Sequence, residues 1–255
     1  RFSAAGASLP ASSLLTSLDL DRKPNMRRIP WVRTQILLEG VRASGSRYDP
    51  RMPRAESKKT AQAATLPSRL RIVGGRWRGM RIDFPPIEAI RPTPDRVRET
   101  LFNWLQQHIL GAACLDLFAG SGALGIEALS RGALHVTFVD REPRIVKHLN
   151  ATLARLQAMN AEVVTSDALL YLKGPPRRFD TVFLDPPFAS EVLPQVFTLL
   201  ARGWLAPIAH IYVECSARSP LPALPPGWSL HRSKRAGEVG YHLLQAVTEA
   251  VEDAS

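Results

Sequence analysis

The tetrapeptide Asp185-Pro186-Pro187-Phe188 places a carboxylate, two prolines and an aromatic ring directly after an apolar run. Residues 179–184 predict a buried parallel strand, so the tetrapeptide would lie where open α/β sheets bind their ligands. Asp185 and the carbonyl of Pro186 could accept the two N–H bonds of an exocyclic amine and direct its lone pair at a methyl donor. Phe188 offers a face for stacking a base. The pattern favours methylation of such an amine; a simple proline turn is the structural alternative.

The elements that must position this tetrapeptide alternate between strand and helix. The expected strands cover 113–118, 135–140, 162–166, 179–184 and 209–215, with helices near 122–131, 143–158, 168–173 and 191–202. Residues 228–234 and 239–247 predict an antiparallel hairpin at the end of the domain. This order is typical of a Rossmann-like, doubly wound α/β fold with a mostly parallel, seven-stranded sheet.

A second hairpin is expected ahead of this domain core. Residues 70–73 and 80–82 predict its strands, within a segment that spans 69–84. Residues 96–105 predict an amphipathic helix with an apolar stripe at Val97, Leu101, Trp104 and Leu105.

The N-terminal quarter of the chain has a different composition. Residues 1–66 are rich in Ala, Ser, Arg and Pro and lack a sustained period, which predicts a disordered basic extension with at most a short helix at 34–41. We therefore expect the folded domain at 67–250 and a short tail at 251–255. The chain begins at Arg1, so this start could be a fragment, a processed end or an over-extended gene start. We expect a cytoplasmic protein, or an organellar one if the extension is a transit peptide.

The net charge of +10 is concentrated on the N-terminal side: +7 in residues 1–66, +4 in 67–100 and −1 in 101–255. This distribution favours a nucleic-acid partner. Five arginines surround Trp77 in the first hairpin and are expected to contact phosphates of a shaped RNA, although a solvated hairpin would look the same. The expected RNA-binding residues are Arg69, Arg71, Arg76, Trp77, Arg78 and Arg81.

Neither a membrane span nor a metal site is expected. No apolar stretch has the length of a membrane-spanning helix. Cys114 and Cys215 both lie in apolar strand-like runs without a second ligand at metal spacing, so buried free thiols are expected.

A glycine turn follows the strand at 113–118. Residues 120–125 satisfy the pattern G-x-G-x-x-G, and Asp140 ends the next strand, 20 residues after Gly120, where an acid can hold ribose hydroxyls. NAD and S-adenosylmethionine both suit such a turn. Asp116 favours S-adenosylmethionine, because its carboxylate would repel a pyrophosphate and attract an ammonium and a sulfonium; capping of the loop is its alternative role. Asp167 could bind an adenine amino group or cap the following helix.

Residues 70–247 resemble the bacterial 16S rRNA (guanine(966)-N(2))-methyltransferases, which act on the 30S subunit. The matching motifs lie at 71–79, 91–93 with 95–104, 116–131 and 185–188. The resemblance implies that the R-P-T helix covers the cofactor pocket and that D-P-P-F holds the guanine amine. Pro94 departs from the usual Thr, and the family often has Glu around 138–140. The expected cofactor-binding residues are Arg91, Thr93, Asp116, Phe118, Ala119, Gly120, Ser121, Gly122, Asp140, Arg141, Asp167 and Ala168; the expected catalytic residues are Asp185, Pro186, Pro187 and Phe188.

The resemblance therefore implies a monomeric enzyme of the class I methyltransferase fold that uses S-adenosylmethionine to methylate a guanine N2 amine of 16S rRNA. From the residues alone, several alternatives stay open. Adenine N6 in DNA or RNA and a glutamine amide present similar amines, and a non-catalytic RNA-binding assembly factor could keep the same fold.

Overall fold

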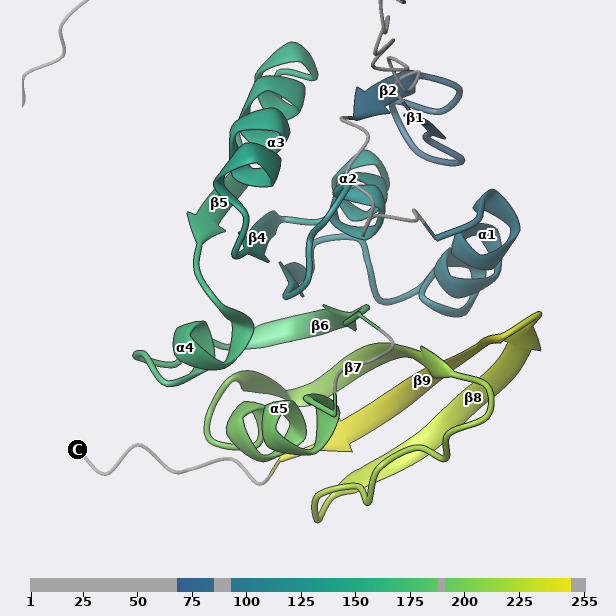
Figure 1. Cartoon of the computed structure of the whole chain (residues 1–255), viewed down its shortest axis with the longest axis vertical. Coiled ribbons are helices and arrows are strands. Elements are labelled where there is room, and N and C mark those ends of the chain that lie inside the picture. Colours follow the sequence, from purple (N-terminus) through teal and green to yellow (C-terminus); the bar gives the residue numbers. More distant parts are fainter. Residues whose placement is uncertain (1–67, 85–92, 188–190, 249–255) are drawn as a thin grey trace, which may run out of the picture. The chain divides into compact units, whose positions relative to one another are not determined.

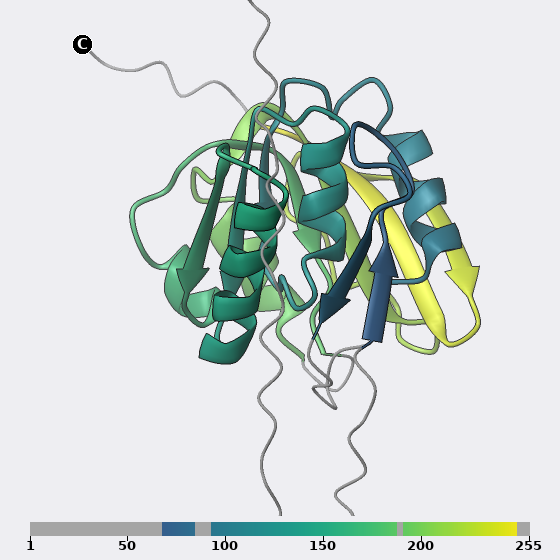
Figure 2. The same ribbon diagram turned by 90° about the horizontal axis from the view of Figure 1, so that it is seen from above.

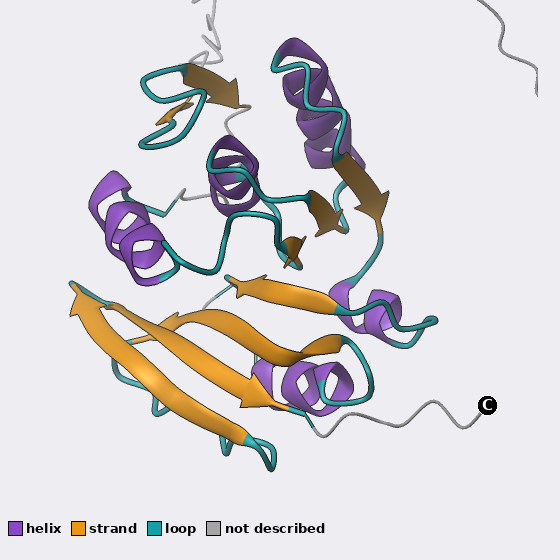
Figure 3. Cartoon of the chain, turned by 180° about the vertical axis from the view of Figure 1, so that it is seen from behind, coloured by secondary structure: helices purple, strands orange, loops and turns teal. Residues whose placement is uncertain are grey.

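The computed structural model describes residues 68–84, 93–187 and 191–248, and most of them form a single mixed sheet with flanking helices (Figure 1). The strands of this sheet are β3 (Ala113–Asp116), β4 (His135–Asp140), β5 (Ala161–Thr165), β6 (Phe179–Leu184), β7 (Leu205–Ser216), β8 (Trp228–Ala236) and β9 (Val239–Val247). Their order is β5-β4-β3-β6-β7-β9-β8. The first five pair in parallel, whereas β9 is antiparallel to both β7 and β8. Figure 3 shows β7, β9 and β8 as the long strands of the sheet.

Helices cover both faces of the sheet. The helices are α1 (Asp95–Trp104), α2 (Ala123–Ser130), α3 (Pro143–Arg155), α4 (Ala168–Leu172) and α5 (Leu193–Leu200). One buried apolar cluster joins α1, α2 and α3 to the sheet, and a second joins α4 and α5 to its other face. This arrangement confirms the predicted doubly wound architecture with a C-terminal antiparallel hairpin.

Most predicted boundaries are within a few residues of the observed ones, and β7 is the largest exception. The strand begins at Leu205, whereas the sequence predicted 209. Pro207 accounts for the error, because a proline suggests a strand break. In the structure, Leu205 pairs with Phe179 before an irregularity in the register, and the carbonyl of Pro207 accepts a hydrogen bond from the N–H of Thr248 (2.9 Å).

A separate two-stranded sheet, β1 (Ser68–Arg71) with β2 (Arg81–Phe84), contributes apolar side chains to the buried cluster that contains α1, α2 and α3. Its turn is held by the last residue of α2: Ser130 Oγ donates to the carbonyl of Gly74 (2.6 Å) and accepts from the N–H of Trp77 (3.0 Å). The helix α2 starts at the Gly122 turn, near the carboxyl ends of the parallel strands, and ends at Ser130. The hairpin turn, which Ser130 holds, therefore lies near the amino-terminal ends of these strands (Figure 2).

A fully buried ion pair joins this hairpin to α1 and α2. Arg98 and Glu127 are both completely buried, and Arg98 Nη1 lies 3.6 Å from Glu127 Oε2. Arg98 also donates to the carbonyls of Arg71 (2.7 Å) and Thr93 (3.2 Å), while Glu127 accepts from the N–H of Val73 (2.9 Å). The pair therefore fixes the entry into α1, including Thr93.

Arg98→Ala should lower the free energy of unfolding by about 2–4 kcal/mol, because it deletes a fully buried side chain with its hydrogen bonds and removes one of the two cations of Glu127, leaving only Arg131 (2.8 Å). Urea denaturation measures this decrease. Arg96→Ala is the matched control, since Arg96 is exposed on the same helix, and it should change the free energy by no more than about 0.5 kcal/mol. A decrease below about 1 kcal/mol for Arg98→Ala would contradict the central role of the pair.

Candidate active site

Three buried or half-buried acids lie at the carboxyl ends of adjacent strands. Asp116 ends β3, Asp185 follows β6, and Glu214 lies near the end of β7. The registers place them close together, because Asp116 pairs with Phe183 on β6, and Leu184 pairs with Val213 on β7. The strand order reverses between β3 and β6, the position at which doubly wound sheets bind ligands.

The hydroxyl of Thr93 links the two acids nearest to the tetrapeptide. Thr93 Oγ1 donates to Glu214 Oε1 (2.9 Å) and also hydrogen-bonds with Asp185. The hydroxyl of Tyr212 donates to the same Glu214 oxygen (2.8 Å), and Glu214 is only 3% exposed. Thr93 was a predicted site residue, and the structure brings it to Asp185. Arg91 and Phe188 lie outside the described residues.

Burial raises the pKa values of both acids, and charge repulsion adds to the shift of Asp185. For Asp185, burial raises the pKa well above its usual range, and the charges of Glu214 and Asp116 raise it further. Burial also raises the pKa of Glu214, although the hydrogen bonds from Tyr212 and Thr93 partly offset this. Two carboxyl groups in one desolvated site therefore compete for ionisation.

Sequence reasoning missed Glu214 and Tyr212. The signal was present, since Glu214 is a single acid within an otherwise apolar strand-like run. An acid at such a position is almost never fully buried unless it has partners. Its position beside Asp185 depended on the register between β6 and β7, which the sequence alone does not define.

Glycines and Asp140 shape the turn after β3. Gly120 and Gly122 have positive φ values of 50° and 75°, which favour glycine. Asp140, at the end of β4, accepts from the N–H groups of Gly120 and Glu142, both at 2.9 Å. The third glycine of the pattern has a packing role, because a Cβ on Gly125 would lie 2.2 Å from the ring of Phe138.

The two acids for which a capping role was the alternative, Asp116 in the loop and Asp167 at a helix start, both accept hydrogen bonds from backbone N–H groups. Asp116 Oδ2 accepts from the N–H of Gly125 (2.9 Å) in the first turn of α2. Asp167 Oδ1 accepts from the N–H groups of Leu169 (2.9 Å) and Leu170 (3.2 Å) at the start of α4. The predicted cofactor contacts of these acids stay predictions. The other predicted cofactor-binding residues lie at the carboxyl ends of three adjacent strands. They are Asp116, Phe118, Ala119, Gly120, Ser121 and Gly122 at the end of β3 and in the following turn, Asp140 and Arg141 at the end of β4, and Asp167 and Ala168 after β5.

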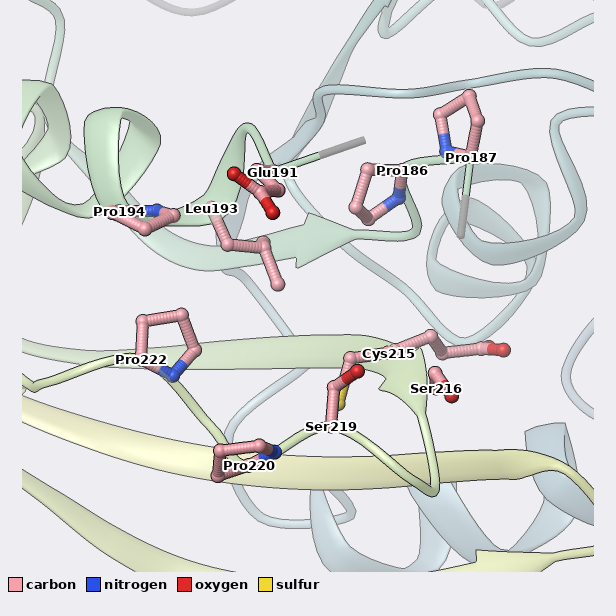
Figure 4. A pocket seen from close by; sticks show the side chains of 11 residues that line it. Pro186, Pro187, Glu191, Leu193, Pro194, Cys215, Ser216, Ser219, Pro220 and Pro222 are labelled. Atoms are coloured by element: carbon pink, nitrogen blue, oxygen red, sulfur yellow. The ribbon is translucent and has the colours of Figure 1, made fainter. Parts of the chain in front are cut away.

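A cavity of about 400 Å³ adjoins the tetrapeptide on the side of α5. Figure 4 shows Pro186 and Leu193 on one side of it and Ser219 and Pro220 on the other. Its size is within the range of ligand pockets. We refer to it as the proline cavity.

Within the described parts of the chain, no group of three or more His, Cys, Asp or Glu residues is arranged to hold a metal ion. None of the described helices is long and apolar enough to cross a membrane.

The predicted RNA-binding arginines lie on the β1–β2 hairpin, and several have partners within the protein. Arg69 pairs with Asp83 (3.0 Å) and Arg71 with Asp95 (3.1 Å). The guanidinium of Arg76 lies 4.2 Å from the ring centroid of Trp77, which is 8% exposed and packs in the core. Arg78 and Arg81 are exposed. The turn that carries residues 76–78 lies near the amino-terminal ends of the parallel strands, whereas Asp185 follows the carboxyl end of β6. The role of this turn in RNA binding stays a prediction.

The two cysteines are buried free thiols, as predicted. Burial raises the pKa values of both Cys114 and Cys215, and nearby carboxylates raise them further. Thiols of this kind are structural and chemically inert.

The sheet order, the glycine turn and the D-P-P motif after β6 define a methyltransferase of class I. The family model described as "Conserved hypothetical protein 95" matches residues 70–245. This chain belongs to that family, together with proteins named ribosomal RNA small subunit methyltransferase D.

Three relatives illustrate the similarity. Ribosomal RNA small subunit methyltransferase D of Escherichia coli is 49% identical over 188 residues, which cover 72% of this chain and 94% of the relative. Its namesake in Haemophilus influenzae is 43% identical over 192 residues, 73% of this chain and 99% of the relative. The solved structure of the putative methyltransferase yhhF from Escherichia coli has 45% identity and a TM-score of 0.67, and the match covers 71% of this chain and 100% of that one.

Asp116→Asn should flatten the pH dependence of stability. Burial raises the pKa of Asp116 from 3.8 to about 7, with a contribution from Asp140, although the hydrogen bond from Gly125 lowers it. At a pH between 3.8 and about 7, Asp116 is protonated in the folded state but ionised in the unfolded state. The stability that Asp116 contributes at low pH is therefore lost as the pH rises through about 7. The asparagine oxygen can still accept from Gly125 but does not titrate.

The measurement is the free energy of unfolding at pH 5 and pH 8 for the wild type and the Asp116→Asn variant. The decrease between these values should be smaller in the variant, by on the order of 2–3 kcal/mol. The variant also lacks the Asp116 charge that raises the pKa of Asp185, which makes its decrease smaller still and so acts in the same direction. Equal decreases would show that Asp116 titrates normally in the folded protein.

Proposed function

We propose that this protein transfers a methyl group from S-adenosylmethionine to the exocyclic N2 amine of a guanine in 16S rRNA, within the small ribosomal subunit. The observation that carries the proposal is the position of Asp185-Pro186, which lies beside the glycine turn at the strand-order reversal and opens onto the proline cavity. The names of the relatives, which specify small-subunit rRNA, support the choice of substrate.

The residues around the turn fit S-adenosylmethionine. Gly120 and Gly122 let the backbone approach a ligand closely, and Asp140 at the strand end suits ribose hydroxyls, with its carboxylate already oriented by two backbone N–H groups. The buried carboxylate of Asp116 suits a cationic ligand end. The sulfonium of the cofactor supplies an electrophilic methyl group.

The residues after β6 fit the acceptor amine. Asp185 and the carbonyl of Pro186 would each accept one N–H of the amine, which favours a pyramidal nitrogen with its lone pair available. The methylated nitrogen must then release a proton, and the carboxylate of Asp185 is placed to accept it. Burial raises the pKa of Asp185, which makes its carboxylate a stronger base than an exposed aspartate.

A second carboxyl group beside Asp185 favours guanine over adenine. Guanine presents N1–H and N2–H₂ donors next to each other on its Watson–Crick edge, whereas adenine presents an N6–H₂ donor beside the N1 acceptor. An ionised Asp185 only accepts hydrogen bonds, and the carbonyl oxygen of Glu214 accepts them in either protonation state, so the two groups together complement a run of donors.

Methyl transfer from labelled S-adenosylmethionine to assembled 30S subunits, free 16S rRNA and DNA tests the proposal, with subsequent mapping of the modified base. Label at a guanine N2 of 16S rRNA supports it. Label at adenine N6 would favour the alternative enzyme, and binding of 16S rRNA without transfer to any of the three substrates would favour a non-catalytic assembly factor.

Asp185→Ala should reduce the turnover rate by about 10² to 10³, because the variant lacks one acceptor that acts in the transition state. Asp185→Asn should be nearly as slow, since its amide can present donors where an acceptor is required. Calorimetric titration with S-adenosylmethionine should give an affinity near that of the wild type. Turnover within about threefold of the wild type in either variant would exclude the proposed role of Asp185.

Glu214→Gln should move the acid limb of the pH–rate profile to lower pH. Catalysis requires ionised Asp185, and the negative charge of Glu214 raises the pKa of Asp185. Removing that charge lets Asp185 ionise at lower pH, while the glutamine oxygen can still accept from Thr93 and Tyr212. The readout is kcat against pH, with Glu162→Gln, an exposed position on β5, as the control. An unmoved or raised limb would contradict the coupling.

A further inference from the structure

A second hollow, of about 330 Å³, lies beside the proline cavity at the carboxyl end of the sheet. The two hollows share Ser216 and Ser219, so they form neighbouring parts of one surface. The second hollow continues across β9 and β8 and is lined by Ser233, Lys234, Arg235 and His242. A ligand in the proline cavity can therefore extend into it without crossing the body of the protein.

The registers place two cations of β8 in line with the active site. Arg235 pairs with Gly240 and Lys234 with Tyr241 on β9, and Tyr241 pairs in turn with Glu214 on β7. Adjacent strands lie about 4.8 Å apart, so Lys234 is roughly 10 Å across the sheet from Glu214 and roughly 15 Å from the end of β6. A few nucleotides on one side of a bound base would span this distance.

The edge strand β8 is strongly basic. All its residues after Trp228 are exposed, and they include His231, Arg232, Lys234 and Arg235 but no carboxylate. Among the residues that the structure describes, none forms an ion pair with these cations. The acid of the adjacent turn, Glu238, pairs instead with Arg218 (2.9 Å).

Side chains on both faces of β8 contribute to this surface. Arg235 is on the face of the second hollow, and its Nε donates to the carbonyl of Gly237 (2.8 Å), which orients the guanidinium. Lys234 points to the opposite face, with its Nζ 5.9 Å from the ring centroid of Trp104. His242 adds no charge at neutral pH, because burial lowers its pKa, and it hydrogen-bonds with Ser233 (2.9 Å). The positive charge of the hollow therefore comes mainly from Arg235, and Lys234 adds positive charge at the other face of the same edge strand.

We propose that the second hollow and the adjoining edge of β8 bind the phosphodiester backbone of the RNA beside the target nucleotide, with Arg235 on a phosphate in the hollow and Lys234 on a neighbouring phosphate at the other face of the edge strand, while the target base occupies the proline cavity. The proposal rests on the proposed function and adds a docking site to it. Phosphate contacts of this kind position a substrate without reading its sequence. In contrast to β8, the β1–β2 hairpin has two of its five arginines neutralised by Asp83 and Asp95. Its turn lies near the amino-terminal ends of the parallel strands, away from Asp185.

A double variant, Lys234→Ala with Arg235→Ala, tests the docking site. With 16S rRNA as the probe, direct binding should weaken by about fivefold or more, and the log–log salt slope should decrease by about one unit for each phosphate that the variant no longer neutralises. With 30S subunits as substrate, KM should rise while kcat at saturating RNA stays within about threefold, because the groups around Asp185 are unchanged.

The matched control is Arg155→Ala with Arg202→Ala, which removes the same charge from exposed positions outside the proposed RNA path. It should bind 16S rRNA with nearly the wild-type salt slope. Affinity and slope within error of the wild type for the β8 variant would overturn the proposal, and so would an equal weakening in both double variants, since that would reflect net charge alone.

Binding and methylation are measured separately so that the two proposals can fail separately. If wild-type protein binds 16S rRNA through β8 but transfers no methyl group to it, the docking site stands and the proposed activity is wrong. If wild-type protein methylates the rRNA and the β8 variant binds and reacts normally, the activity stands and β8 is merely a charged edge that prevents strand-to-strand association.

Discussion

The buried pair of Arg98 and Glu127 is the interaction on which the rest of the structure depends. Neither side chain is exposed to solvent, so each charge relies on the other, on one further partner (Asp95 for Arg98 and Arg131 for Glu127) and on the backbone groups around it. Through these contacts the β1–β2 hairpin, α1 and α2 are fixed to one another, and the carbonyl of Thr93 is held in place. The hydroxyl of Thr93 then reaches the two acids of the candidate site. An ion pair on one face of the sheet thus sets the position of a hydroxyl at the carboxyl ends of the parallel strands.

The candidate site shows how one fold can place several acids in a small volume. Asp116, Asp185 and Glu214 come from three adjacent strands, and each of them is desolvated. The hydrogen bonds from Gly125, Thr93 and Tyr212 favour the ionised forms, but burial and mutual repulsion outweigh them. Acids whose pKa values are raised by burial in one cluster are typical of functional sites.

The sequence predicted the fold and the strand-end residues well, because both follow from local patterns. Apolar runs and glycine turns identified the order of the elements, and the strand preceding Asp185 showed where the tetrapeptide had to lie. Properties that depend on register or on tertiary packing were not predictable. In the sequence, Glu214 is an ordinary strand residue, Arg98 an ordinary helix residue, and the hairpin arginines a continuous basic surface. The strand register places Glu214 beside Asp185, and the ion pairs with Glu127 and Asp83 place Arg98 and Arg69.

All eight residues of α2 are buried, and this has a consequence for local opening of the molecule. The helix is only about 12 Å long, with the Gly122 turn at one end and Ser130, which holds the hairpin turn, at the other. A helix without a solvent-exposed face cannot fray alone, so its amides exchange with solvent only when its neighbours open too. The glycine turn and the hairpin turn therefore belong to one cooperative unit. A ligand that tightens the first will slow hydrogen exchange in the second, across the thickness of the domain.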